Sequence, residues 1–167
     1  QGLQYDMTEG SVERTYSDAD MVEIDTDYVA EYGQLNFAIT AADGSDMLSM
    51  IFWVEEADAE IGIPAGVYPI NDSGDYNTVY ASPGVQNGSV YPSFYGKLAA
   101  NGGITTPLYF LEGGNVVVEN VDGRVKITVA AVNSYDVPIH IVYDGTEGID
   151  TSIENVTVAQ TGCVGMC

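Results

Sequence analysis

One segment restricts the possible folds most: residues 115–132, in which two apolar runs flank the pair Asp122-Gly123. An Asp-Gly pair suits the two central positions of a type I′ turn, which joins two strands in a tight hairpin. Counting outward from the turn gives three cross-strand pairs: Val118 with Ile127, Val116 with Val129, and Glu119 with Lys126. The two apolar pairs share one face, and the charged pair lies on the other. The segment therefore predicts an antiparallel hairpin with one buried face.

Short runs of alternating apolar and polar residues recur along the rest of the chain, and helical periodicity is almost absent. Residues 34–40 alternate most clearly, whereas residues 47–54 are apolar on both faces, as expected of a central strand. A proline and a glycine within residues 63–68 predict a turn that leads into a short strand. Residues 71–103 predict long surface loops, or strands with long connections. Further strands are expected at residues 78–81, 93–98, 137–143 and 153–159.

These strands and turns predict an all-β fold of one domain, either an antiparallel β-sandwich, which we favour, or a barrel-like closed sheet. A chain of 167 residues suffices for one hydrophobic core. We expect residues 1–30 to be an N-terminal extension or the first strands, and residues 31–160 to be the core domain. Residues 161–167 would then be a tail that contains the cysteines.

The charge of the chain excludes some partners. The chain has 25 acidic and four basic residues, a formal net charge of −21, and this field repels nucleic acid and anionic membranes. Hydrophobic residues still make up 46% of the chain, which is too many for a disordered polyanion. No apolar run approaches the roughly 18 residues of a membrane-spanning helix. We therefore expect a folded, acidic, soluble domain with no membrane span; its oligomeric state stays open.

The two cysteines, Cys163 and Cys167, lie at the end of the chain. They could form a small disulfide in an oxidising compartment or remain free thiols. A zinc site would need about two further ligands, and His140 is the only histidine. No basic-then-apolar signal segment stands at Gln1, so we expect an exported form to have lost its signal.

Three stretches carry a family resemblance: Gln34-Leu35-Asn36-Phe37, residues 63–68, and the block from Glu112-Gly113-Gly114 to Tyr143-Asp144-Gly145. They resemble a group of small secreted lipoproteins from gut Bacteroidetes, most of which have no assigned activity. The resemblance implies a β-sandwich or barrel-like fold and export to the cell surface or periplasm. It also implies tethering by a lipidated cysteine upstream of this chain, and it transfers no catalytic residue.

Five aromatic residues gather in a polar, glycine-rich stretch: Tyr76, Tyr80, Tyr91, Phe94 and Tyr95. Exposed rings beside Asp and Asn are typical of sugar or protein recognition, although the same rings could instead pack in the core. The leading hypothesis is a non-enzymatic exported protein that binds a glycan or a protein partner at the cell surface. The alternatives are a structural or adhesin subunit and a divergent all-β hydrolase.

A weaker pattern places oxygen-bearing side chains at alternate positions, as in a calcium loop: Asn71, Ser73, Asp75 and Asn77. The bidentate acid of an EF-hand is missing, and an ordinary polar turn explains the same residues. We expect no cofactor, and a calcium requirement stays open.

Overall fold

The computed structural model describes residues 6–17, 22–55, 63–145 and 152–154. These residues form strands and no helix, which confirms the all-β prediction. The strands in the first half of the chain are β1 (Val12–Ser17), β2 (Glu23–Val29), β3 (Gln34–Thr40), β4 (Asp46–Trp53), β5 (Gly66–Asn71) and β6 (Thr78–Tyr80). Those in the second half are β7 (Val85–Gln86), β8 (Ser89–Val90), β9 (Phe94–Leu98), β10 (Ile104–Phe110), β11 (Gly113–Val121), β12 (Arg124–Val132), β13 (Pro138–Gly145) and β14 (Ser152–Glu154).

Strands β11 and β12 form the hairpin expected from the sequence, and all three predicted cross-strand pairs are observed. Asp122 and Gly123 have φ angles of 54° and 79°, positive at both central positions as a type I′ turn requires. The four side chains of the two apolar pairs are buried. Local turn chemistry and the burial pattern therefore select the same register.

Twelve strands form one sheet in the order β1-β13-β12-β11-β5-β6-β4-β3-β2-β14, with β9 added to β4 and β10 added to β9; β7 and β8 form a small second sheet. Most neighbours are antiparallel, as expected, but three pairs are parallel: β1 with β13, β14 with β2, and β5 with β6. The first two pairs join segments far apart in the sequence, so no hairpin turn sets the strand direction. Both β1 and β2 fall within residues 1–30.

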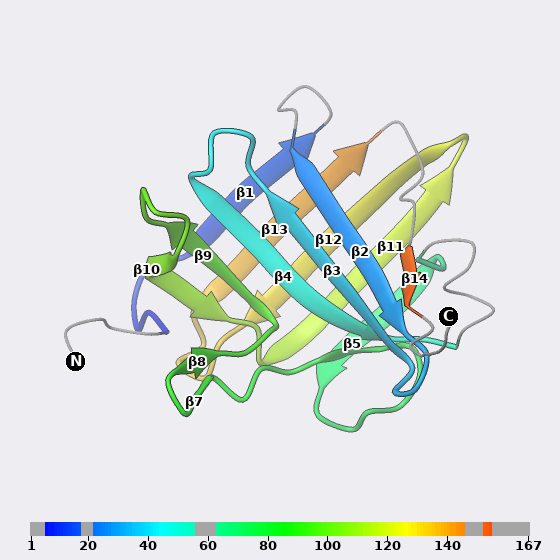
Figure 1. Cartoon of the computed structure of the whole chain (residues 1–167), viewed down its shortest axis with the longest axis horizontal. Coiled ribbons are helices and arrows are strands. Elements are labelled where there is room, and N and C mark those ends of the chain that lie inside the picture. The colour runs from blue at the N-terminus through cyan, green and yellow to red at the C-terminus, as the bar shows by residue number, and fades with distance from the viewer. Residues whose placement is uncertain (1–5, 18–21, 56–62, 146–151, 155–167) are drawn as a thin grey trace.

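The large sheet is curled and open. In Figure 1, β2, β3 and β4 lie in front of β1, β13, β12 and β11. Inward-facing side chains of both halves pack into one hydrophobic core, to which β3 contributes Leu35, Phe37 and Ile39. The largest fully buried side chains include three tyrosines: Tyr16, Tyr28 and Tyr68. The curl therefore lets one long sheet enclose its own core.

Strand β4 is central, as expected for a strand that is apolar on both faces. One edge of β4 pairs with β3, and the other pairs first with β9 and then with β6. Ser93 lies where β9 gives way to β6: its Oγ accepts a hydrogen bond from Ile51 N (3.4 Å) and donates one to Tyr80 O (2.7 Å). The stretch 71–103 thus contributes strands to the sheet, and Ser93 anchors the end of β6 that carries Tyr80.

Candidate ligand-binding groove

The structure separates the five aromatic candidates into two groups. Phe94 and Tyr95 are each 4% exposed. Tyr95 faces the main core, and Phe94 packs with a smaller apolar cluster around β10, so neither ring is available at the surface. Tyr76 and Tyr91 are 53% and 39% exposed, and Tyr80 is half-buried. The candidates that can meet a ligand are therefore Tyr76, Tyr80 and Tyr91.

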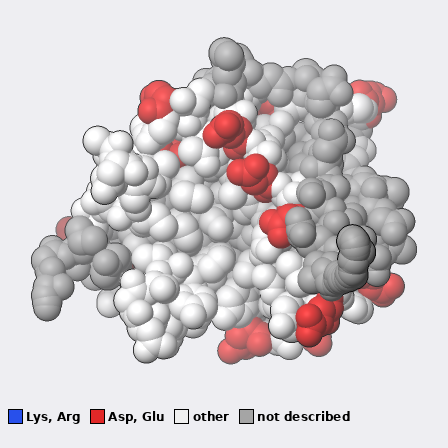
Figure 2. Space-filling view, viewed as in Figure 1, with Lys and Arg blue, Asp and Glu red and all other residues white. Residues whose placement is uncertain are grey.

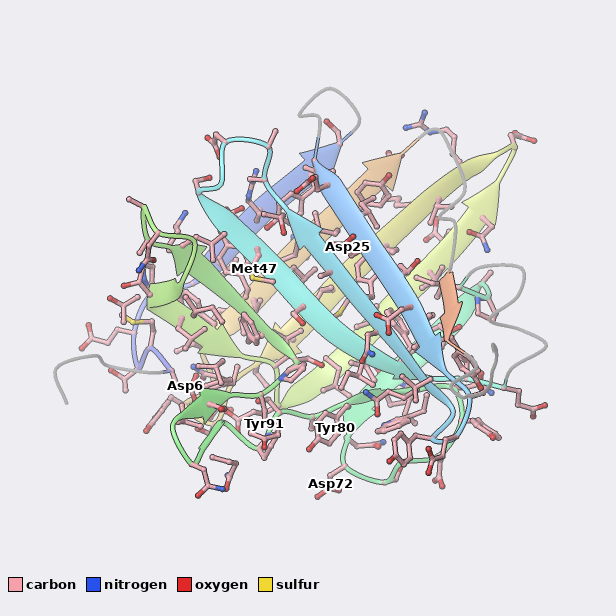
Figure 3. All side chains as sticks on the ribbon, viewed as in Figure 1. Asp6, Asp25, Met47, Asp72, Tyr80 and Tyr91 are labelled. Carbon is pink, nitrogen blue, oxygen red and sulfur yellow. The ribbon has the colours of Figure 1, made fainter. Side chains whose placement is uncertain are left out.

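Tyr80 lines a groove of about 650 Å³ at the ends of β5 and β6. Figure 3 shows Tyr80, Tyr91 and Asp72 on the same side of the molecule, the lower side in this view. This volume falls within the roughly 300–1,000 Å³ typical of small-molecule sites. The lining residues are Ile70, Asn71, Asp72, Tyr80, Ala81, Ser82, Pro83 and Glu112.

Strand pairing places the ring and the amide of the groove opposite each other. Asn71 and Tyr80 are direct partners in the parallel ladder of β5 and β6, so their side chains lie on the same face. The Trp53 ring packs edge-to-face against the Tyr80 ring, with 5.9 Å between centroids. Packing against Trp53 orients the Tyr80 ring at the wall of the groove, and the Ser93 hydrogen bond holds the Tyr80 backbone beneath it.

Several polar groups of the groove are free to bind a ligand. Within the described part of the chain, the Tyr80 hydroxyl, the Asn71 amide nitrogen and the Asp72 carboxylate have no hydrogen-bond or ion-pair partner. The Ser82 hydroxyl is engaged, because it donates to Tyr91 O (2.8 Å) and accepts from Gly84 N (3.0 Å). The groove therefore presents one aromatic wall with a donor and acceptors beside it.

Glu112 adds a second carboxyl group to the groove. Its Oε2 accepts a hydrogen bond from Ser134 N (2.9 Å). Burial raises the pKa of Glu112, and a hydrogen bond to Asp6 together with the charge of Asp6 raises it further. Asp6 is held by neutral donors: its Oδ1 accepts from Asn133 Nδ2 (2.8 Å) and from Phe110 N (3.2 Å). One end of the groove thus adjoins a pair of neighbouring carboxyl groups.

The four residues considered for calcium form a local turn. Asn71 Oδ1 accepts hydrogen bonds from Ser73 N (3.1 Å) and Ser73 Oγ (2.8 Å), and Ser73 Oγ accepts one from Asp75 N (3.1 Å). Asn77 has a φ of 69° and donates its N–H to Trp53 O. Among the described residues, no group of three or more His, Cys, Asp or Glu side chains is arranged to hold a metal ion. Cys163 and Cys167 lie outside the described residues.

A second polar cluster surrounds Asp46, whose side chain is 3% exposed. Asp46 accepts hydrogen bonds from Arg14 Nε (2.8 Å), Tyr16 Oη (3.0 Å) and Tyr95 Oη (2.6 Å), and Lys97 Nζ lies 3.8 Å away. Burial alone would raise the pKa of Asp46, but the hydrogen bonds and the Arg14 charge hold it below its usual range. The cluster ties β1 to β4 and β9 through side chains.

Sequence reasoning did not identify Glu112, Asp72 or Asp46 as important residues. A local signal existed for Asp46, because it occupies the first inward position of a strand that continues inward with Leu48, Met50 and Phe52. A carboxylate on such a face needs a partner, which predicts a buried ion pair. No comparable signal marks Glu112 and Asp72, since the fold brings them together from separate loops.

The charge around the groove is one-sided. All four basic residues of the chain lie in the described part: Arg14 and Lys97 contact Asp46, Arg124 pairs with Asp144, and Lys126 faces Glu119 across the hairpin. None of them lines the groove. Figure 2 shows acidic side chains and no lysine or arginine on the face formed by β2, β3 and β4.

Comparison with protein-family models, with curated proteins and with solved structures found no match to this chain. No helix in the described ranges has the length and hydrophobicity needed to cross a membrane.

Proposed function

We propose that this chain is a non-enzymatic, exported binding domain whose ligand, a glycan, occupies the groove beside β5 and β6. The observation that carries the proposal is the Tyr80 ring, flanked within one groove by the free polar groups of Asn71 and Asp72. Sugars combine apolar C–H faces with many hydroxyl groups. A ring with adjacent amide and carboxylate groups complements both features.

The groove favours a compact ligand over a protein surface. Protein interfaces of standard size bury roughly 800 Å² per partner and are centred on well-packed anchors. The groove instead has a volume within the small-molecule range, and its exposed polar groups surround a single ring. A glycan end or side branch fits these features better than a flat protein face.

The remaining parts of the proposal rest on the family resemblance. We place the protein at the cell surface or in the periplasm, attached through a lipidated cysteine upstream of this chain. In this view the curled sheet is a barrel-like or sandwich-like support, and the Asp46 cluster joins β1 to β4 and β9 where the backbone ladder does not. A rigid support of this kind positions a binding site without taking part in chemistry.

A glycan panel tests the proposal. Tyr80→Ala should weaken binding of any captured oligosaccharide about 10-fold, whereas Tyr80→Phe separates the part due to the hydroxyl from the part due to the ring. Tyr76→Ala is the matched control, because Tyr76 is an exposed tyrosine outside the groove lining. Melting curves of all three variants report on folding. Failure of the parent protein to bind any glycan, or full binding by Tyr80→Ala, would refute the proposal.

A further inference from the structure

The groove contains an unbalanced negative charge. Two of its eight lining residues, Asp72 and Glu112, carry carboxyl groups, and Asp6 contacts Glu112 from behind. Asp72 is exposed and has no cationic partner in the described part of the chain. Since every lysine and arginine is accounted for elsewhere, no lysine or arginine supplies a positive charge to this groove.

A ligand can supply that charge. Carboxylates that line one site focus a negative potential, and at a net charge of −21 the rest of the molecule reinforces this potential. A positive group near Glu112 would also relieve the repulsion between its carboxyl group and that of Asp6. Charge complementarity therefore favours a cationic occupant over a neutral one and strongly disfavours an anionic one.

We propose that the groove recognises an amino sugar, a hexose unit that carries a protonated amine, with the amine between Asp72 and Glu112 and a sugar face against Tyr80. This inference rests on the proposed function, since it names the class of glycan that the groove takes. A lysine-rich peptide would satisfy the same charges, but it would leave the aromatic wall without a flat apolar partner. The Tyr80 ring, held by Trp53, therefore favours the sugar.

Three tetrasaccharides test the inference by calorimetry: β-1,4-linked glucosamine, its fully N-acetylated form, and the glucose tetramer. The glucosamine tetramer should bind at least about 10-fold more tightly than the two neutral tetramers at about 0.05 M salt. This preference should shrink at about 0.5 M salt, because salt screens the ion pairs. A lysine-rich peptide is measured beside them.

Asp72→Asn should weaken binding of the glucosamine tetramer about 3-fold to 10-fold and weaken binding of the neutral tetramers less, so that the preference for the charged tetramer falls. Asp75→Asn is the matched control, because Asp75 is an exposed acid on the same loop that does not line the groove. Glu112→Gln provides a second variant with the same expected pattern.

The outcomes separate the two proposals. Equal binding of all three tetramers, or no effect of Asp72→Asn, overturns the amino-sugar inference and leaves glycan binding standing. Binding of the peptide alone overturns both in favour of a basic protein partner. Binding of none of the probes overturns the inference, and the wider glycan panel then decides the proposed function.

Discussion

Two buried aspartates hold distant parts of this molecule together, and their surroundings differ in one respect. Asp46 accepts hydrogen bonds from a guanidinium and two phenols, so a full positive charge faces it. Asp6 accepts hydrogen bonds from an amide, a backbone N–H and a hydroxyl, and its charged neighbour is another acid, Glu112. Each carboxylate is well supplied with donors, but only one is paired with a cation.

The two clusters shift the pKa values of their acids in opposite directions, downward for Asp46 and upward for Glu112. The Arg14 charge helps to hold the pKa of Asp46 below its usual range, whereas Asp6 helps to raise the pKa of Glu112. The surroundings of Asp46 therefore favour ionisation of its carboxyl group, whereas those of Glu112 make ionisation less favourable.

Removal of the carboxylate from the Asp46 cluster should have the largest effect. Asp46→Ala leaves the partly buried Arg14 guanidinium and two buried tyrosine hydroxyls without their acceptor. We expect a loss of about 2–4 kcal/mol in the free energy of unfolding, measured by urea denaturation. Asp43→Ala is the comparison: Asp43 is exposed and its Oδ1 accepts a single turn hydrogen bond, from Ser45 N (3.0 Å), so this change should destabilise the protein much less than Asp46→Ala. A loss below 1 kcal/mol in Asp46→Ala would show that the cluster does not hold β1 in place.

The β11–β12 hairpin provides a reference region without a buried charge. Gly123→Val places a β-branched residue at a φ of 79° and should cost about 1–3 kcal/mol. Because the strain is in the backbone, the cost should be the same at about pH 3 and at about pH 8, unlike the cost of changing Asp46, whose contribution is lost toward acid. Urea midpoints at both pH values provide the measurement. An unchanged midpoint would contradict the type I′ turn.

The Asp6 cluster should tolerate substitution better than the Asp46 cluster. Asp6→Asn keeps one oxygen acceptor but removes the charge that faces Glu112, so lost hydrogen bonds and relieved repulsion partly cancel. We expect a loss of about 0.5–1.5 kcal/mol in unfolding free energy. Asn133→Ala serves as the comparison and should cost more than Asp6→Asn, because it relieves no repulsion and removes the donor to Asp6 and Met7 O together with the acceptor of Tyr135 N and Val137 N. If Asp6→Asn cost more than Asp46→Ala, the proposed difference between the clusters would be wrong.

The same contrast explains which parts of the fold the sequence could predict. The β11–β12 register follows from residues within one turn and its flanking strands, so local chemistry was sufficient. The Arg14–Asp46 contact spans 32 residues and the Asp6–Asn133 contact spans 127, and neither is visible without knowing which strands meet. The parallel partners of β1 and β14 were missed for the same reason.

Adjacent aromatic residues show a further limit of sequence reasoning. Phe94 and Tyr95 point to opposite faces of β9, and alternation would expose one of them. Both are buried because Phe94 packs in the small apolar cluster with Leu108 and Phe110 of the neighbouring strand β10, against which Val85 of β7 and Val90 of β8 pack. The groove beside Tyr80 is likewise formed by three separate parts of the chain: the end of β5, residues 80–83 and Glu112. No local sequence pattern indicates that these parts lie together.

The smallest expected effect is the pH response of Glu112, and its sign is the sharpest test of the contrast. A raised pKa in the folded state means that the contribution of Glu112 to stability is complete below its pKa in the unfolded chain, about 4.3, and is lost as pH rises through the folded-state value. The glutamine in Glu112→Gln cannot ionise, so the stability of the parent should fall relative to this variant as pH rises. The fall should be less than about 1 kcal/mol, because solvent screens a carboxyl group that faces the groove. The folded-state pKa of Asp46 is lowered instead, so the contribution of Asp46 to stability is complete above its pKa in the unfolded chain, about 3.9, and is lost as pH falls. The parent should therefore be more stable than Asp46→Asn at neutral pH, and this difference in unfolding free energy should shrink toward acid. Urea unfolding of the parent and both variants from about pH 3 to pH 8 measures the two slopes. Slopes of the same sign would mean that the charge of the neighbouring residue does not distinguish the two clusters.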